Sequence, residues 1–133
     1  MGANITILLD LYNKHVRSIL EYAAPAWSPM ITTENCEEIE RVQKSAYFVI
    51  FGPMSYEKTL KLSNSLTLEQ RRVELCNKFA KKCSTSPVFA NWFNKKENVA
   101  NTRNPKTYTE VQARCNRWMN SPIPHMTKLL NNQ

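Results

Sequence analysis

The sequence predicts an all-α protein with a helical hairpin, a third long helix, shorter helices and an irregular C-terminal tail. Only two of its 133 residues are glycine, which argues against a turn-rich sheet architecture. Apolar residues recur at three- and four-residue steps in several long stretches, which is the spacing of one helix face. With 42% hydrophobic residues, a chain of this length can bury a core of its own.

Residues 33–52 form the stretch with the clearest helix boundaries. Thr33 is the expected N-cap, because its hydroxyl can accept a hydrogen bond from a first-turn N–H group. Gly52 and Pro53 are expected to end the helix, because glycine tolerates a left-handed backbone and proline cannot continue a helix. The predicted buried face consists of Ile39, Val42, Ala46, Val49 and Ile50.

Residues 5–22 are predicted to form the other arm of the hairpin. Pro25 is expected to end this arm, and residues 26–29 to form a short rigid connector between the two antiparallel helices. The apolar stripe of this arm consists of Ile5, Leu8, Leu9, Tyr12, Val16, Ile19, Leu20 and Ala23.

A capping box, Thr67-Leu-Glu-Gln70, is expected to begin the third long helix, because its hydroxyl and amide groups satisfy each other's backbone donors. The helix is predicted to run to about Cys83. Short helices are predicted over residues 55–63 and from Ser86. The inner face of the long helix is expected to contain Leu68, Leu75, Cys76, Phe79 and Cys83.

Three regions are expected along the chain. Residues 1–93 form a helical domain, residues 94–107 an exposed loop without periodicity, and residues 108–133 a tail that packs on the helical domain. Within the tail, two prolines are expected to keep residues 121–124 extended. Met126, Leu129 and Leu130 suit a final short helix.

The basic residues are concentrated late in the chain. The formal net charge is +7, and residues 1–57 hold four Lys and Arg against seven Asp and Glu, whereas residues 58–133 hold fourteen against four. This division predicts either an anion-facing half or a solvated basic surface. Cationic side chains bind phosphates without reading sequence, so the candidate nucleic-acid contacts are Arg71, Arg72, Lys78, Lys81, Lys82, Arg114 and Arg117.

Some of these residues have a second interpretation. Arg72 can instead pair with Glu40 or Glu69. Tyr108 and Trp118 lie near the late arginines and could stack on bases, but we favour the interpretation that both rings close the core.

No metal, cofactor or membrane segment is predicted. The four cysteines form no C-x-x-C pair, and neither histidine completes a zinc spacing, so reduced thiols are expected. No apolar run has the length of a membrane span, and no signal peptide is visible. An intracellular protein, nuclear or cytoplasmic, is therefore expected.

Several short motifs follow one another in a fixed order over residues 8–131. They include Leu11-Tyr12, Val16-Arg17-Ser18-Ile19-Leu20-Glu21-Tyr22, Pro25-x-Trp27-Ser28-Pro29, Ile39-Glu40-Arg41-Val42-Gln43-Lys44-x-Ala46, Leu66-x-Leu68-x-x-Arg71-Arg72 and Asn120-Ser-Pro-Ile-Pro124. This ordered set resembles the region downstream of the palm in reverse transcriptases of non-LTR (LINE-type, jockey-like) retrotransposons. The sequence departs from that family at Tyr47 and Phe48, where a basic residue is frequent, and at Asn64, where leucine is expected.

The resemblance implies a thumb and C-terminal region, present as a fragment or a truncated reading frame, that lies against a primer–template duplex. The implied partners are RNA or an RNA–DNA duplex, together with the polymerase palm of a parent polypeptide or a second copy. It also favours phosphate contact for the basic cluster on the third long helix. The rival interpretations are a helical protein-interaction or self-association module, or a genomic remnant.

No catalytic residue is predicted in this chain. A polymerase palm needs paired aspartates for two Mg²⁺ ions, and the sequence contains a single aspartate, Asp10. The chain is therefore not expected to be an enzyme on its own.

Overall fold

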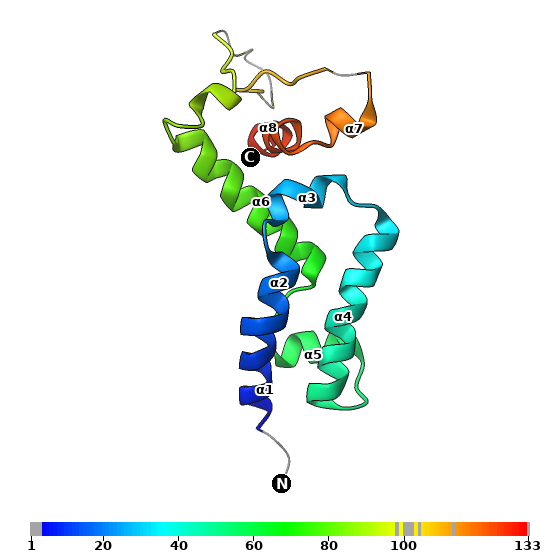
Figure 1. The fold of residues 1–133 in the computed structure, drawn as a ribbon. Coiled ribbons are helices and arrows are strands. Elements are labelled where there is room, and N and C mark those ends of the chain that lie inside the picture. Colours follow the sequence, from blue (N-terminus) through cyan, green and yellow to red (C-terminus); the bar gives the residue numbers. More distant parts are fainter. Residues whose placement is uncertain (1–3, 98, 100–102, 104, 113, 133) are drawn as a thin grey trace. The chain divides into compact units, whose positions relative to one another are not determined.

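The computed structural model describes residues 4–97, 99, 103, 105–112 and 114–132. Most of these residues lie in helices, those between Trp92 and Asn116 do not, and the described residues contain no β-strand, only an isolated antiparallel bridge between Lys95 and Tyr108 (Figure 1). The predicted all-α fold class is confirmed.

The internal contacts divide the chain into two compact units. Unit 1 comprises Met1–Ala24 and Ile31–Arg72, and unit 2 comprises Pro25–Met30 and Val73–Gln133. The long helix α6 (Leu68–Thr85) contributes to both. The division thus falls at residues 72 and 73, whereas the sequence pattern placed the end of the helical domain at residue 93.

Unit 1 contains the predicted helical hairpin. In Figure 1 its first arm, drawn in blue, lies antiparallel to α4 (Thr33–Phe51), drawn in cyan. The rings of Tyr12 and Tyr47 meet edge to face between the arms, with centroids 5.4 Å apart. The first arm is one continuous helical run made of α1 (Ile5–Leu11), the π-helical segment η1 (Tyr12–Arg17) and α2 (Ser18–Glu21).

The buried face of α4 differs from the prediction. Gln43 and Tyr47 are its buried residues, whereas Val42 is 43% and Val49 78% exposed. The apolar periodicity misplaced this face because it treats every polar side chain as outward-facing, although a glutamine whose hydrogen bonds are satisfied can lie in the core. The predicted stripe of the first arm is also wrong at three positions, Ile5, Ile19 and Ala23, which are exposed.

Helix α4 begins with a threonine cap and ends at a glycine, as predicted, but the cap lies one residue earlier than expected. Thr32, not Thr33, is the N-cap, and its hydroxyl accepts a hydrogen bond from the Asn35 N–H at 3.3 Å. Gly52 ends the helix with φ +80°, a backbone conformation that residues with a Cβ atom rarely adopt. The glycine stop is confirmed.

The connector between the hairpin arms, predicted only as a short rigid link, is itself helical. It consists of α3 (Ala24–Trp27) and the 3₁₀ turn η2 (Ser28–Met30). Pro25 is tolerated because it lies in the first turn of α3, where backbone N–H groups have no partner within the helix.

The start of α6 in unit 1 confirms the predicted capping box. The Gln70 N–H donates to the Thr67 hydroxyl at 3.2 Å, and the Thr67 N–H donates to the Gln70 side-chain oxygen at 3.3 Å. The short helix α5 (Tyr56–Leu62) precedes this cap, within the predicted range 55–63.

Unit 2 is built on the second half of α6. Cys76 and Cys83 are buried as predicted, and all four cysteines are free thiols. Phe79 is exposed and Ala80 is buried instead, which corrects the predicted inner face. The core of unit 2 contains Ala80, Cys83, Phe93 and Met126, flanked by Phe89, Tyr108, Ile123 and Leu130.

The predicted final helix is confirmed, but it begins earlier than expected. It is α8 (Pro122–Asn131), so residues 121–124 are not an extended stretch. Both prolines lie in its first turn, where the missing N–H groups cost no intrahelical hydrogen bond. The shorter elements of unit 2 are η3 (Ala90–Trp92) and α7 (Asn116–Met119).

The region predicted as an exposed loop, residues 94–107, is exposed wherever the structure describes it. The Lys96 N–H donates to the Thr107 carbonyl at 3.0 Å, and the Thr109 N–H donates to the Asn94 carbonyl at 2.8 Å. Residues 98, 100–102 and 104 of this region lie outside the described residues. Within the described ranges, no helix has both the length and the apolar character needed to cross a bilayer.

Candidate nucleic-acid interface

The residues that give the chain its positive net charge lie in unit 2. Unit 1 contains eight Lys and Arg and eight Asp and Glu, so its formal net charge is zero. Unit 2 contains ten Lys and Arg against three Asp and Glu, a net charge of +7. A surplus of this size on about half of the chain raises the local concentration of anions around that half.

Three of the predicted contact residues lie together on α6. Lys78, Lys81 and Lys82 are three and four residues apart, so their side chains share one face of the helix. All three are exposed, and none of them forms an ion pair with another described residue. The opposite face packs into the core through Cys76, Ala80 and Cys83, which fixes the lysines on the solvent side.

The two predicted arginines of the tail are also exposed, but they do not share a helix. Arg114 precedes α7, whereas Arg117 lies within it. Arg117 lines two adjoining open hollows of about 450 and 290 Å³. The larger hollow is also lined by Met30 and Asn120, and the smaller by Met30, Cys115, Trp118 and Ser121.

The two aromatic rings of the tail have different environments. Tyr108 packs edge to face on Phe93 in the core of unit 2, with ring centroids 6.0 Å apart, which confirms the core interpretation for that residue. Trp118 is 53% exposed, so the core interpretation is wrong for Trp118.

Arg71 and Arg72 do not belong to this basic surface. The Nε and Nη2 atoms of Arg71 donate to the two carboxylate oxygens of Glu21 at 3.1 Å each, in the bidentate geometry of a strong ion pair. Arg72 is only 2% exposed. Both residues lie in the neutral unit 1, and the fold brings Glu21 to Arg71 from 50 positions away in the sequence. We therefore exclude both from the candidate interface.

Two basic residues were missed because they lie in the predicted loop. Lys95 and Lys96 are exposed and lie beside the Lys95–Tyr108 bridge, which attaches them to unit 2. Their two adjacent positive charges were the sequence signal that could have identified them as candidate phosphate contacts. Lys106 is less available, because its ammonium group donates to the Glu110 carboxylate at 3.0 Å.

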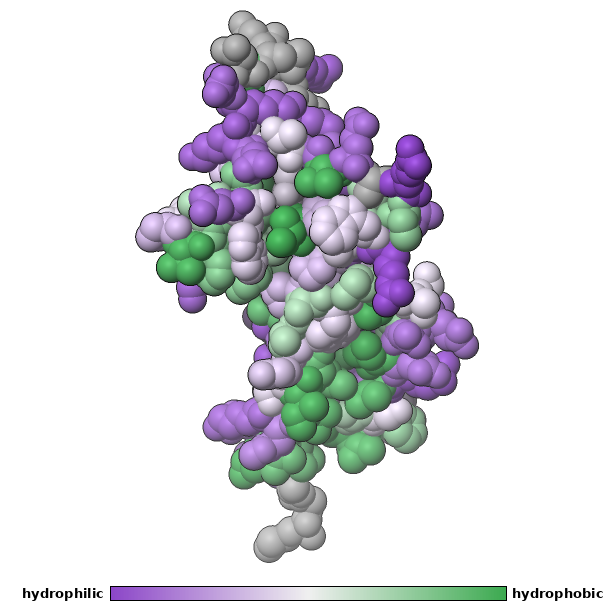
Figure 2. All heavy atoms as spheres, turned by 45° about the horizontal axis from the view of Figure 1, so that its top comes forward, coloured by the Kyte–Doolittle hydropathy of each residue, from purple (hydrophilic) through white to green (hydrophobic). Residues whose placement is uncertain are grey.

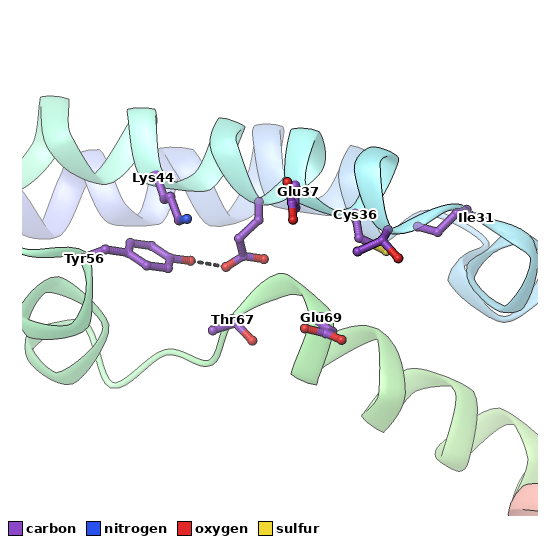
Figure 3. Close-up of a pocket in the computed structure, with 9 residues that line it drawn as sticks. Ile31, Cys36, Glu37, Lys44, Tyr56, Thr67 and Glu69 are labelled. Atoms are coloured by element: carbon purple, nitrogen blue, oxygen red, sulfur yellow. Dashed lines mark hydrogen bonds between the residues drawn. The ribbon is translucent and has the colours of Figure 1, made fainter.

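A pocket of about 440 Å³ lies within unit 1 (Figure 3). The close-up shows Lys44 beside the ring of Tyr56, whose centroid lies 5.4 Å from the Lys44 Nζ. The pocket is acidic, because its lining includes Glu37, Glu40 and Glu69.

Glu40, one of these carboxylates, already has protein donors. Its Oε1 accepts a hydrogen bond from the Tyr56 hydroxyl, and its Oε2 accepts one from the Leu68 N–H at 3.0 Å. Burial, reinforced by the bond to Glu40, raises the pKa of Tyr56, so its hydroxyl remains a donor. Since Leu68 is the first residue of α6, this carboxylate serves to position that helix.

Neither a metal site nor a match to a known protein adds to this description. Among the described residues, no three His, Cys, Asp or Glu side chains are grouped so that they could hold a metal ion. No protein-family model matches the chain, and no curated protein or solved structure matches it either.

Proposed function

We propose that this chain binds RNA or an RNA–DNA duplex through the phosphate backbone, with unit 2 as the binding surface. The observation that carries the proposal is the location of the entire net charge of +7 on unit 2. Ammonium and guanidinium groups that neutralise phosphates release condensed counterions, which supports tight binding without sequence specificity. This is the role that the resemblance to the thumb and C-terminal region of a LINE-type reverse transcriptase implies.

The proposed interface keeps five of the seven residues predicted from the sequence and gains two. The exposed side chains that support it are Lys78, Lys81, Lys82, Lys95, Lys96, Arg114 and Arg117. We assign no catalytic step to this chain. In the proposed arrangement a separate polymerase palm carries out nucleotide addition, and unit 2 holds the nucleic acid.

The test compares two double variants with the same loss of charge. Lys81→Ala/Lys82→Ala removes two charges from the proposed interface, whereas Lys58→Ala/Lys61→Ala removes two exposed lysines from α5 of the neutral unit 1. Binding of a fluorescently labelled RNA–DNA duplex is measured by anisotropy between about 50 and 200 mM salt. In a plot of log Kobs against log salt, the first variant is expected to lose roughly 2 from the magnitude of the slope, with affinity about tenfold weaker at low salt.

The unit 1 control is expected to leave both the slope and the affinity unchanged. Equal weakening in the two variants would show a general effect of net charge and would contradict a specific interface on unit 2. Absence of binding by the unmodified chain at low salt would contradict the proposed function itself.

A second candidate function is protein binding through unit 1. Figure 2 shows apolar side chains gathered over the helices of unit 1, and Ile7, Phe48 and Val49 are among the exposed apolar residues of the hairpin. Exposed apolar surface of this kind favours contact with another protein surface, here a polymerase palm or a second copy. A concentration-dependent dimer in sedimentation velocity, together with no nucleic-acid binding, would favour this candidate.

A further inference from the structure

Trp118 differs from four other aromatic residues of unit 2, which pack in pairs. Phe93 and Tyr108 pack against each other, and Phe89 and Trp92 pack with ring centroids 4.6 Å apart. Trp118 makes no ring contact with any described residue. Leaving about half of a tryptophan in water forgoes much of the free energy that burial of an indole would contribute.

The surroundings of Trp118 match the chemistry of a nucleotide. The indole and the Met30 side chain line the same hollow of about 290 Å³, so a flat apolar face and a polarizable thioether adjoin one space. Arg117 lines this hollow and the adjoining one of about 450 Å³, and it forms no ion pair within the described part of the chain. Asn120 adds one amide donor and one acceptor group to the second hollow.

We propose that the Trp118 hollow is a stacking site for one unpaired nucleobase, with Arg117 contacting the adjacent phosphate. In a duplex each base is already stacked on both sides, whereas an unpaired base offers a free face to an aromatic side chain. The inference rests on the proposed function, since a nucleic acid must first bind unit 2. It adds a preference for a single-stranded segment, which the lysines of α6 do not provide because they contact only phosphates.

The test uses the full chain and three labelled probes: a uridine decanucleotide, a thymidine decanucleotide and a blunt RNA–DNA duplex. Trp118→Ala is expected to weaken binding of the single strands about tenfold, because one base–aromatic stack is lost, and to change duplex affinity less than about twofold. Trp118→Phe retains an aromatic face and is expected to restore most of the affinity. Loss for both single strands identifies base stacking, whereas loss for the uridine strand alone adds a contact to the ribose 2′-hydroxyl.

Trp92→Ala is the matched control, because Trp92 is 41% exposed in the same unit but packs on Phe89. Trp92→Ala is expected to change neither the single-strand affinity nor the duplex affinity. Equal weakening of single strand and duplex in Trp118→Ala would overturn the stacking site, and so would the absence of any effect.

A second measurement does not depend on the folding of an alanine variant. In Trp27→Phe/Trp92→Phe, Trp118 is the remaining tryptophan, and stacking of a base is expected to quench its fluorescence when the uridine strand is added. Unchanged fluorescence at saturation would overturn the proposal. If the unmodified chain binds the single strands and the duplex and Trp118→Ala has no effect, the stacking site fails and the proposed function stands. If the unmodified chain binds none of the three probes, the stacking site and the proposed function both fail.

Discussion

Gln43 lies at the centre of unit 1, with 0% of its surface exposed. Its Oε1 accepts a hydrogen bond from the Tyr12 hydroxyl at 2.9 Å. Its Nε2 donates to the Tyr56 hydroxyl at 2.7 Å and to the Leu66 carbonyl at 3.2 Å. One amide therefore joins both hairpin arms to the segment that leads into α6, and these bonds offset the cost of burying a polar side chain.

We expect Gln43→Leu to lower the free energy of unfolding by about 2 to 4 kcal/mol, because it leaves the Tyr12 hydroxyl and the Leu66 carbonyl without this partner. Tyr12→Phe removes one of the bonds and is expected to cost about 1 kcal/mol. Urea denaturation followed by circular dichroism measures both. In the Gln43→Leu background the Tyr12→Phe substitution is expected to cost nothing more, and full additivity would contradict the proposed coupling.

The C-terminal end of α5 explains why asparagine occupies position 64, where the resemblance predicts leucine. The Asn64 N–H donates to the Lys61 carbonyl at 3.2 Å, and the Ser65 N–H donates to the Leu60 carbonyl at 3.0 Å. These are the two hydrogen bonds of a Schellman motif, which places its C′ residue in a left-handed conformation. Asn64 has φ +48°, so an asparagine is better suited to this position than the leucine expected from the resemblance.

Asn64→Leu is therefore expected to destabilise unit 1 by about 1 kcal/mol, because leucine has no side-chain group to compensate the left-handed backbone. Asn64→Gly is expected to be neutral or slightly stabilising, since glycine adopts this conformation without strain. Thermal denaturation of the two variants gives the comparison. A leucine variant as stable as the glycine variant would show that the left-handed turn is absent in solution.

Acid is expected to destabilise unit 2 through two groups, His125 and Glu110. Burial, reinforced by the charge of Lys128, lowers the pKa of His125 from its ordinary value of 6.5. As the pH falls through 6.5, His125 is protonated in the unfolded chain before it is protonated in the folded chain, so the free energy of unfolding decreases. Hydrogen bonds from Lys106 and Asn131 lower the pKa of Glu110 below 4.5. The stability that this carboxylate contributes is present above its unfolded pKa and is lost as the pH falls through its lower folded pKa.

Tryptophan fluorescence isolates this effect, because Trp27, Trp92 and Trp118 all belong to unit 2. We expect the urea midpoint measured by fluorescence to decrease steadily between pH 7 and pH 4. His125→Gln removes the histidine proton and is expected to flatten the part of this decrease just below pH 6.5. A fluorescence midpoint that rises on acidification would contradict the signs assigned to both groups.

Local sequence patterns are enough to predict the long helices and several of their ends, because these depend on hydrogen bonds between near neighbours. Three features were predicted from residues close together in the sequence: the Thr67–Gln70 capping box, the Gly52 stop and the Cys76–Cys83 face of α6. The all-α class follows from such local features.

Long-range packing determines which polar groups are available to a partner, and no local pattern reveals it. Arg71 and Glu21 are 50 residues apart, and Tyr12 and Gln43 are 31 apart, so neither pairing has a local signature. The same holds for Trp118, whose exposure depends on which rings fill the core of unit 2. Charge counts indicate that an anion can bind, but the internal ion pairs and burial decide which cations remain to bind it.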